Sequence, residues 1–469
     1  MRTQTPGRTH LPRTATLLAA SALGVYLLVM VGAATSLLDG TAACSTWPAC
    51  GSEWLVTADA SPALLAAWSH RVVTLLVGIL LLVTTVLAWT RRSTRRVRWA
   101  LLAVALLFPV QMALGALTAV SGAPVSLSAV HLLVGMGIFA GVLVALLAQL
   151  EADVPAGAED LAGERPPTDE PAPEPAAPPA DGPLATVSAY VELTKPKLWW
   201  LLCLVALAAM GMAAGRSLPL DTAVATVVGG VLAIGASGTF NNVIERDVDK
   251  RMARTNERPL VEGRIPVRNA LTFGVLLAAA SVAVFVAFVN VLSAVLGLLA
   301  ILYYSVGYTM LLKPHTTQNI VIGGGVGAFP ALIGWAAVTD TIGMPAVVLG
   351  AVIFLWTPAH FYNLAMVYKE DYARAGFPML PVVRGDAVTR RHVLGYLGAT
   401  MLSAVLLGTS GALDWPFAAA ATVLGGVFLW AVVRLYRERT RRAAFRAFHA
   451  SNAYLGTILV VVLVDAFVA

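Results

Sequence analysis

The amino-acid sequence predicts an all-α membrane protein that crosses the bilayer many times. Hydrophobic residues make up 58% of the 469 residues and charged residues only 12%, and the mean hydropathy is +0.77. The apolar residues form long runs, and a membrane-spanning helix needs about 20 consecutive apolar residues. Basic residues collect in every second loop between these runs, as in multi-pass proteins. We therefore expect a polytopic protein with about 13 transmembrane helices.

The apolar runs fall into two groups, which predicts a four-helix bundle followed by a nine-helix bundle. The first run is too long for the core of a signal peptide, so we expect it to be retained as a span. The expected spans are 15–38, 63–89, 98–120, 126–149, 197–214, 222–241, 270–289, 291–312, 318–338, 343–363, 391–411, 414–433 and 449–468.

Residues 151–189 separate the two groups of spans. This segment contains the run PPTDEPAPEPAAPPADGP, and a chain so rich in Pro, Ala and acids cannot bury a core. We expect a disordered cytoplasmic linker here. The predicted parts are thus a four-span half at 1–150, the linker at 151–189 and a nine-span domain at 190–469.

Basic residues predict the orientation in the membrane. If the spans alternate, nearly all Lys and Arg residues of the loops fall on one side, and Arg216 is the exception. The positive-inside rule then places the N-terminus in the cytoplasm and the C-terminus outside, with the protein in the cell membrane. The net charge of +6 comes from these loops, so we expect no nucleic-acid partner.

Polar residues gather at the predicted cytoplasmic end of span 222–241. The segment 241–259 reads NNVIERDVDKRMARTNERP, and residues four apart share one face of a helix. Side-chain oxygens of Asn241, Asn242, Glu245 and Asp249 suit Mg²⁺, which binds through few carboxylates and shares its shell with substrate phosphates. Ionisable groups beside a span are costly unless a site uses them.

A second polar cluster follows span 343–363 on the same predicted membrane face. It includes Lys369 and Asp371 within WTPAHFYNLAMVYKEDYARAGFPMLPVVRG. Two acidic clusters on one face predict a clamp around a metal–diphosphate, whereas two ordinary charged loops remain the alternative. The basic residues expected to hold diphosphate, or else to act only as topology charges, are Arg254, Arg258, Lys313 and Lys369.

These stretches resemble the protoheme IX farnesyltransferase (haem O synthase) family of UbiA-type intramembrane prenyltransferases. The resemblance covers about residues 186–469 and includes the ordered patterns NNxxxRDxDxxMxRTxxRP, TxQNIVIGG and DYxxAGxPMLPVV. It implies Mg²⁺-dependent transfer of farnesyl from farnesyl diphosphate to a vinyl group of haem B. The family usually has aspartate where this chain has Glu245. The implied catalytic residues are Asn241, Asn242, Glu245, Asp249 and Asp371, with Mg²⁺ held by Asn241, Glu245, Asp249 and Asp371.

The first half carries a pair of cysteines and a pair of histidines. Cys44 and Cys50 bracket STWPA in a predicted outside loop, where either a disulfide or two free thiols fit. His70 and His131 begin two parallel spans at similar depth. Two such imidazoles suit haem iron, although hydrogen bonding between helices is the alternative.

Residues 15–150 are similar to one half of haem A synthase. Four segments carry this resemblance: CSTWPAC, SHRVVTLLVG, QMALGALTAVSG and VHLLVGMG. That family duplicates a four-span bundle, and its His pairs serve haem. The resemblance implies His70 and His131 as haem ligands. The family's glutamate three residues before the His-Arg pair is Ala67 here, which favours haem binding, delivery or support over oxidation of haem O.

The sequence therefore predicts a membrane-bound prenyltransferase that makes haem O, with a haem-binding first half. One alternative is a prenyltransferase for another acceptor, such as a quinone precursor or chlorophyllide. Another is a non-catalytic haem-binding or transport protein. The implied partners are farnesyl diphosphate, haem B, membrane lipid, and haem A synthase or cytochrome oxidase assembly proteins.

Overall fold

The protein is mainly helical in the residues that its computed structural model describes, which are 13–50, 55–57, 59–154, 161, 182–411, 413 and 415–468. Twelve helices in this part of the chain are long and apolar enough to cross a membrane. The predicted all-α membrane class is confirmed, and the number of spans is close to the 13 expected. Most of the predicted linker lies outside the described residues.

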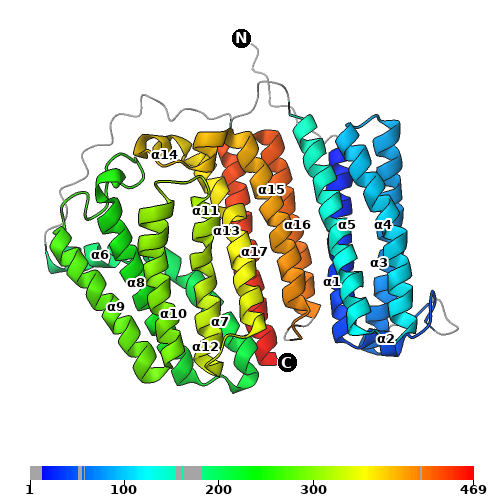
Figure 1. Ribbon diagram of the computed structural model, residues 1–469, viewed down its shortest axis with the longest axis horizontal. Coiled ribbons are helices and arrows are strands. Elements are labelled where there is room, and N and C mark those ends of the chain that lie inside the picture. The colour runs from blue at the N-terminus through cyan, green and yellow to red at the C-terminus, as the bar shows by residue number, and fades with distance from the viewer. Residues whose placement is uncertain are drawn as a thin grey trace, which may run out of the picture. The chain divides into compact units, whose positions relative to one another are not determined.

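The chain divides into two compact units, residues 1–158 with 425–437 and residues 159–424 with 438–469. Four long helices of the first unit pack as a bundle, in which α1 contacts α3 and α5, and α4 contacts α3 and α5 (Figure 1). Its helices are α1 Arg13–Leu37, α2 Gly40–Ala43, α3 Pro62–Thr90, α4 Arg95–Val120 and α5 Val125–Ala152.

Local sequence signals start two of these helices. The side chain of Ser61 accepts a hydrogen bond from the amide of Leu64, and Pro62 occupies the first turn of α3. Thr94 caps α4 by accepting from the amide of Val97. Both caps satisfy amides that have no partner within the helix, so each helix begins where its capping residue stands.

In the second unit, α8 packs on α9, α7 packs on α12 and α17, and α13 packs on α15 and α17. Small residues allow these helices to pack closely. At Gly334 of α12, for example, any larger residue would place its Cβ only 2.2 Å from the carbonyl oxygen of Ala206 in α7, which is too close. The elements are α6 Pro183–Leu193, η1 Pro196–Leu198, α7 Trp199–Ala214, η2 Gly215–Ser217, α8 Leu220–Asp249, α9 Val267–Phe288, α10 Val291–Leu302, the π-helical η3 Tyr303–Leu312, α11 Asn319–Gly323, η4 Gly324–Ala328, α12 Phe329–Thr339, α13 Met344–Val367, α14 Lys369–Ala375, α15 Leu380–Gly408 and α17 Arg441–Val468. Helix α16, Trp415–Glu438, is divided between the units, because its residues 425–437 belong to the first.

Two helices extend beyond the spans expected from hydropathy. Helix α8 continues eight residues past 241 to Asp249, and α15 begins at Leu380 rather than near 391. Both extensions contain charged residues, yet Asp249, Asp386 and Arg390 are buried inside the protein. A hydropathy profile predicts such charged segments to be loops. In the structure they are helical, and these side chains are buried by neighbouring elements.

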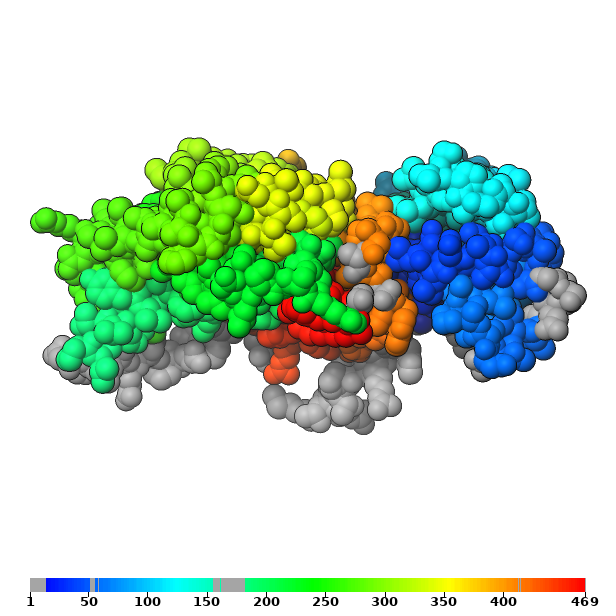
Figure 2. Space-filling model, turned by 90° about the horizontal axis from the view of Figure 1, so that it is seen from below, coloured from blue at the N-terminus to red at the C-terminus, as the bar shows by residue number. Residues whose placement is uncertain are grey.

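Arg216 was the one basic residue that departed from the predicted charge pattern. It lies in η2 and donates hydrogen bonds to the carbonyls of Phe467 and Val468 at the end of α17. Figure 2 shows these two segments, in green and red, side by side. The last carbonyls of a helix lack partners within it, and a cation beside them is stabilised. Arg216 therefore has a structural role on that face.

Candidate active site

The end of α8 gathers the polar residues of the first motif on a buried surface. Asn241, Glu245 and Asp249 are four residues apart and are 2%, 4% and 1% exposed, so they lie on one face of the helix. Asn242 is also buried, but its amide donates to the carbonyls of Leu193 and Gly238. Asn242 therefore links α8 to the end of α6 by hydrogen bonding.

Each acid on this face is paired with a cation from elsewhere in the chain. The Nζ of Lys313 lies 2.5 Å from the Oε1 of Glu245, and it also stands over the Phe377 ring. A guanidinium nitrogen of Arg258 lies 2.6 Å from the Oδ2 of Asp249. The other oxygen of Asp249 is buried without a hydrogen-bond partner in the described residues.

The second motif meets the first at α14. The buried Asp371 accepts a hydrogen bond from the Ala253 amide at 3.4 Å, and Arg374 pairs with the same carboxylate. Arg254 stands over the rings of Tyr368 and Tyr372 at 4.9 and 5.0 Å and donates to the Tyr372 hydroxyl. These contacts hold the loop after α8 against α14. The polar residues of the first motif and those of the second therefore lie next to each other.

The four basic residues expected at diphosphate have different surroundings. Lys313 and Arg258 contact the acids of α8, whereas Arg254 is held by two tyrosines. Lys369 lies 3.5 Å from a carboxylate oxygen of Asp386. The geometry therefore favours Lys313 and Arg258 as the cations nearest to any metal or phosphate at α8.

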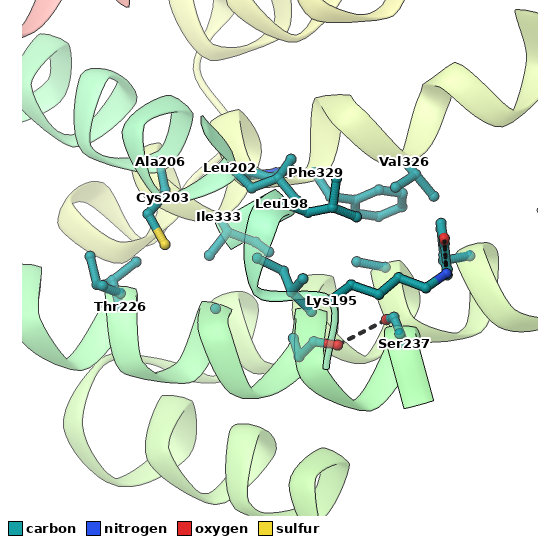
Figure 3. Close-up of a pocket in the computed structure, with 18 residues that line it drawn as sticks. Lys195, Leu198, Leu202, Cys203, Ala206, Thr226, Ser237, Val326, Phe329 and Ile333 are labelled. Carbon is teal, nitrogen blue, oxygen red and sulfur yellow. Dashed lines mark hydrogen bonds between the residues drawn. The ribbon is translucent and has the colours of Figure 1, made fainter. Parts of the chain in front are cut away.

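An apolar cavity leads to this polar cluster. It follows α8 from Thr226 to Gly238, a length of roughly 18 Å. Figure 3 shows Thr226 and Cys203 toward one end and Lys195 reaching along the other. The remaining lining is almost entirely apolar and comes from η1, α7, α8, α10, η3, η4 and α12. Such a cavity suits a long hydrocarbon chain whose polar end faces the acids.

Lys195 lies between the cavity and Asn241 on the polar face of α8. The sequence alone did not identify it as a site residue. Its Nζ donates to the Oδ1 of Asn241 and lies 3.4 Å from the Tyr304 hydroxyl. Burial, together with the charge of Arg258, lowers the pKa of Lys195 to about 7. The available signal was a lysine directly before proline at the start of a span, which resembles an ordinary topology charge.

The first unit contains a closed loop between α1 and α3. Cys44 and Cys50 are joined by a disulfide. Arg71 donates to the carbonyls of Cys44, Thr46 and Pro48. Arg71, which follows His70 in the sequence, thus stabilises the disulfide loop.

The predicted histidine pair lies within the four-helix bundle. His70 and His131 are near enough to interact electrostatically, and the Nδ1 atom of each is buried without a hydrogen-bond partner in the described residues. A Cβ on Gly32 or Gly115 would stand 3.0 Å from the adjacent imidazole. Gln111 contacts His131 at 3.4 Å. Two close imidazoles with free ring nitrogens fit a haem iron.

The family model of the UbiA prenyltransferase family matches residues 202–456. This chain belongs to the UbiA prenyltransferase family. A second model, described as cytochrome oxidase assembly protein, matches residues 15–167. The predicted resemblance of the two halves to two different families is thus confirmed.

Relatives of this UbiA family member share both halves. Protoheme IX farnesyltransferase from Haloarcula marismortui is 54% identical over 458 residues, which cover 96% of this chain and 97% of that protein. The protein of the same name from Roseiflexus castenholzii is 36% identical, with 96% and 83% covered. A solved structure concerning digeranylgeranylglyceryl phosphate synthase is 15% identical, has a TM-score of 0.52 and covers 61% of this chain and 99% of that chain. That structure supports the fold.

The donor set of this UbiA family member suits Mg²⁺. The described residues contain no group of three or more His, Cys, Asp and Glu side chains placed to hold a metal. The face of α8 instead offers one amide and two carboxylates, and one Asp249 oxygen is buried with no hydrogen-bond partner in the described part of the chain. Mg²⁺ takes few carboxylates and completes its shell with water and phosphate oxygens. These residues therefore fit Mg²⁺ that arrives with a diphosphate.

Proposed function

We propose that this protein transfers the farnesyl group of farnesyl diphosphate to a vinyl group of protohaem IX, which gives haem O. The observation that carries the proposal is the apolar cavity that ends at Lys195, whose Nζ contacts Asn241 on the helix face that also carries Glu245 and Asp249 with their partners Lys313 and Arg258. The cavity fits a prenyl chain, and the polar end fits a diphosphate. The haem acceptor is supported by the names of relatives that match along the whole chain.

The residues present divide the work of this reaction. Mg²⁺ held by Asn241, Glu245 and Asp249, with Asp371 opposite, would supply Lewis-acid stabilisation of the leaving diphosphate. Lys313 and Arg258 donate to phosphate oxygens after exchanging their carboxylate partners. The apolar lining of the cavity excludes water and so protects the allylic cation from premature hydrolysis.

The bonds and electrons of the reaction balance with water as the third reactant. The C1–O bond of farnesyl diphosphate breaks, and its electron pair leaves with diphosphate. The π electrons of the haem vinyl group form the new carbon–carbon bond to C1. Water then adds to the cationic carbon of the former vinyl group and releases one proton. The product is a hydroxyethyl-farnesyl side chain together with free diphosphate.

Product analysis tests this function. Membranes that contain the protein are incubated with radiolabelled farnesyl diphosphate, haem B and Mg²⁺, and the haems are extracted. We expect labelled haem O, its loss on chelation with EDTA and its return with added Mg²⁺. A labelled quinone precursor or chlorophyllide without haem O would favour the alternative acceptors instead.

We also propose that the first half binds haem through His70 and His131, because each imidazole keeps a buried ring nitrogen with no hydrogen-bond partner among the residues that the structure describes. Ala67 in place of the family's glutamate argues against oxidation of haem O in this half. The purified protein should show a haem absorption spectrum. Replacement of both histidines by alanine should remove it, and an unchanged spectrum would contradict the ligand assignment.

The location and organisation follow from the same features. We propose a cell-membrane protein with its N-terminus in the cytoplasm and its C-terminus outside, in which a cytoplasmic linker at 151–189 joins domains at 1–150 and 190–469. Haem A synthase or cytochrome oxidase assembly proteins are the proposed protein partners. Reporter fusions in the loops after α3 and α8 should both report a cytoplasmic location.

A further inference from the structure

Lys195 has a strained backbone that the surrounding structure supports. It lies between α6 and η1 with φ 54° and ψ 59°, a left-handed conformation that is unfavourable for a residue with a Cβ atom. The Trp199 indole donates to the carbonyl of Thr194. Gly238 of α8 lets the carbonyl oxygens of Leu193 and Thr194 approach closely. Strain maintained in this way is typical of functional positions.

The ammonium group of Lys195 donates hydrogen bonds to neutral groups and, in the described part of the chain, to no carboxylate. Its partners are the Oδ1 of Asn241 and the hydroxyl of Tyr304, and its Nζ lies 5.7 Å from the centre of the Tyr304 ring. The amide of Asn241 is held in turn by Thr309. Within the described residues, Lys195 forms no ion pair, unlike Lys313 and Arg258. The nearby carboxylates of Glu245 and Asp249 are engaged by Lys313 and Arg258, so an anion bound at the end of the cavity can pair with Nζ of Lys195.

The place of Lys195 identifies which part of a substrate it meets. It lines the cavity (Figure 3) together with Gly238, and its Nζ contacts Asn241, the first residue of the polar face of α8 on which Glu245 and Asp249 follow. With the prenyl chain in the cavity and the terminal phosphate at the acids, the junction holds the C1–O bond and the first phosphate. A cation here meets the oxygen on which negative charge develops as that bond breaks.

We propose that Lys195 binds the phosphate nearest to the prenyl chain and stabilises the oxygen that leaves from C1. This inference rests on the proposed function. It adds a substrate-binding residue from outside both acidic motifs, at the start of the second unit's first long helix. Lys195 thereby distinguishes a prenyl diphosphate from a free prenyl alcohol of the same length.

Three variants of the full chain in detergent test the assignment. Lys195→Met removes the charge and keeps the length of the stem, whereas Lys195→Arg keeps a cation. Lys197→Met is the matched control, because Lys197 is exposed two residues away. The measurements are the dissociation constant of inorganic diphosphate with Mg²⁺, kcat and KM for farnesyl diphosphate, and thermal unfolding with and without diphosphate.

We expect Lys195→Met to weaken diphosphate binding by about 10- to 100-fold, the range for one charge-assisted hydrogen bond. Its kcat should also fall, and diphosphate should no longer raise its unfolding temperature. Lys195→Arg should restore most of the binding, and Lys197→Met should resemble the parent protein.

Diphosphate binding that is unchanged in Lys195→Met would overturn the proposal. An equal loss of diphosphate binding in the Met and Arg variants would also overturn it. The lysine would then act only through its hydrogen bond to Asn241, which positions the start of η1. A parent protein that binds diphosphate but prenylates another acceptor would contradict haem as acceptor and leave the role of Lys195 intact. A parent protein that binds no diphosphate would contradict both proposals.

Discussion

Asp247 and Asp249 are two residues apart on α8 and have opposite environments. The side chain of Asp247 is 68% exposed and pairs with Arg246 and Lys250. That of Asp249 is 1% exposed and pairs with Arg258. Exposed ion pairs contribute little, whereas a buried carboxylate strongly affects its surroundings. The sequence lists both aspartates in one motif, and only the fold separates them.

Asparagine substitutions distinguish the two positions. Asp249→Asn should lower kcat/KM for farnesyl diphosphate by about 100-fold or more, because it removes a charge from the proposed metal-binding face. Asp247→Asn should leave turnover unchanged. Haem content should be the same in both variants. Equal loss of turnover in both would contradict the assignment of the inner face of α8 as the site.

Glu245 provides a test that separates stability from chemistry. Glu245→Gln leaves Lys313 buried without its partner, which should reduce the free energy of unfolding by about 3–5 kcal/mol. Adding Lys313→Met should recover much of that loss in denaturant unfolding, yet turnover should stay low. Recovered turnover in the double variant would show that the pair serves only the fold.

At the scale of elements, hydropathy predicts the long helices well and their polar ends poorly. The span expected at 222–241 ends eight residues before α8 does, because the last turns are polar in sequence and buried in the fold. The ion pair of Lys313 with Glu245 joins residues 68 positions apart. Such long-range pairs have no local signal, so the sequence predicts the acids of the site but not their partners.

The cavity along α8 predicts which prenyl chains the protein accepts. Gly230 lines the cavity, and a Cβ there would meet no atom within 4 Å. Gly230→Leu should therefore fill the cavity without moving the backbone. Its kcat/KM should fall for farnesyl diphosphate relative to geranyl diphosphate by at least about tenfold.

Gly395→Leu is the control for that substitution. Gly395 lies on α15, is exposed and also has open space around its Cα, but it does not line the cavity. Its preference between the two diphosphates should equal that of the parent protein. An unchanged preference in Gly230→Leu would show that the prenyl chain lies elsewhere.

At the scale of the whole molecule, two families are joined in one chain. The motifs of each half predict its family, and relatives with the same extent carry one name. Each compact unit contains its own candidate site, with the histidine pair in the first and the acids in the second. Whether the two sites act together is a property of the whole chain that motifs do not encode.

Histidine variants of the full chain test the independence of the sites. His70→Ala with His131→Ala should remove the haem spectrum and change farnesyl transfer by less than about twofold, because the histidines and the acids belong to different compact units and share no partner among the described residues. His315→Ala, which alters an exposed histidine, should keep the spectrum. A parallel loss of haem and transfer in the double variant would show that the first half supplies the acceptor.

The pairing of each α8 acid with its own cation has a consequence for the order in which ligands associate. Under the proposed function, a diphosphate that attracts Lys313 and Arg258 would release Glu245 and Asp249 to bind Mg²⁺. Mg²⁺ on those acids would release the same cations for diphosphate. By thermodynamic linkage, each ligand then raises the affinity for the other by an equal factor. Titration calorimetry should detect this positive cooperativity, and the exchange of partners limits the charge left unbalanced in the low-dielectric interior.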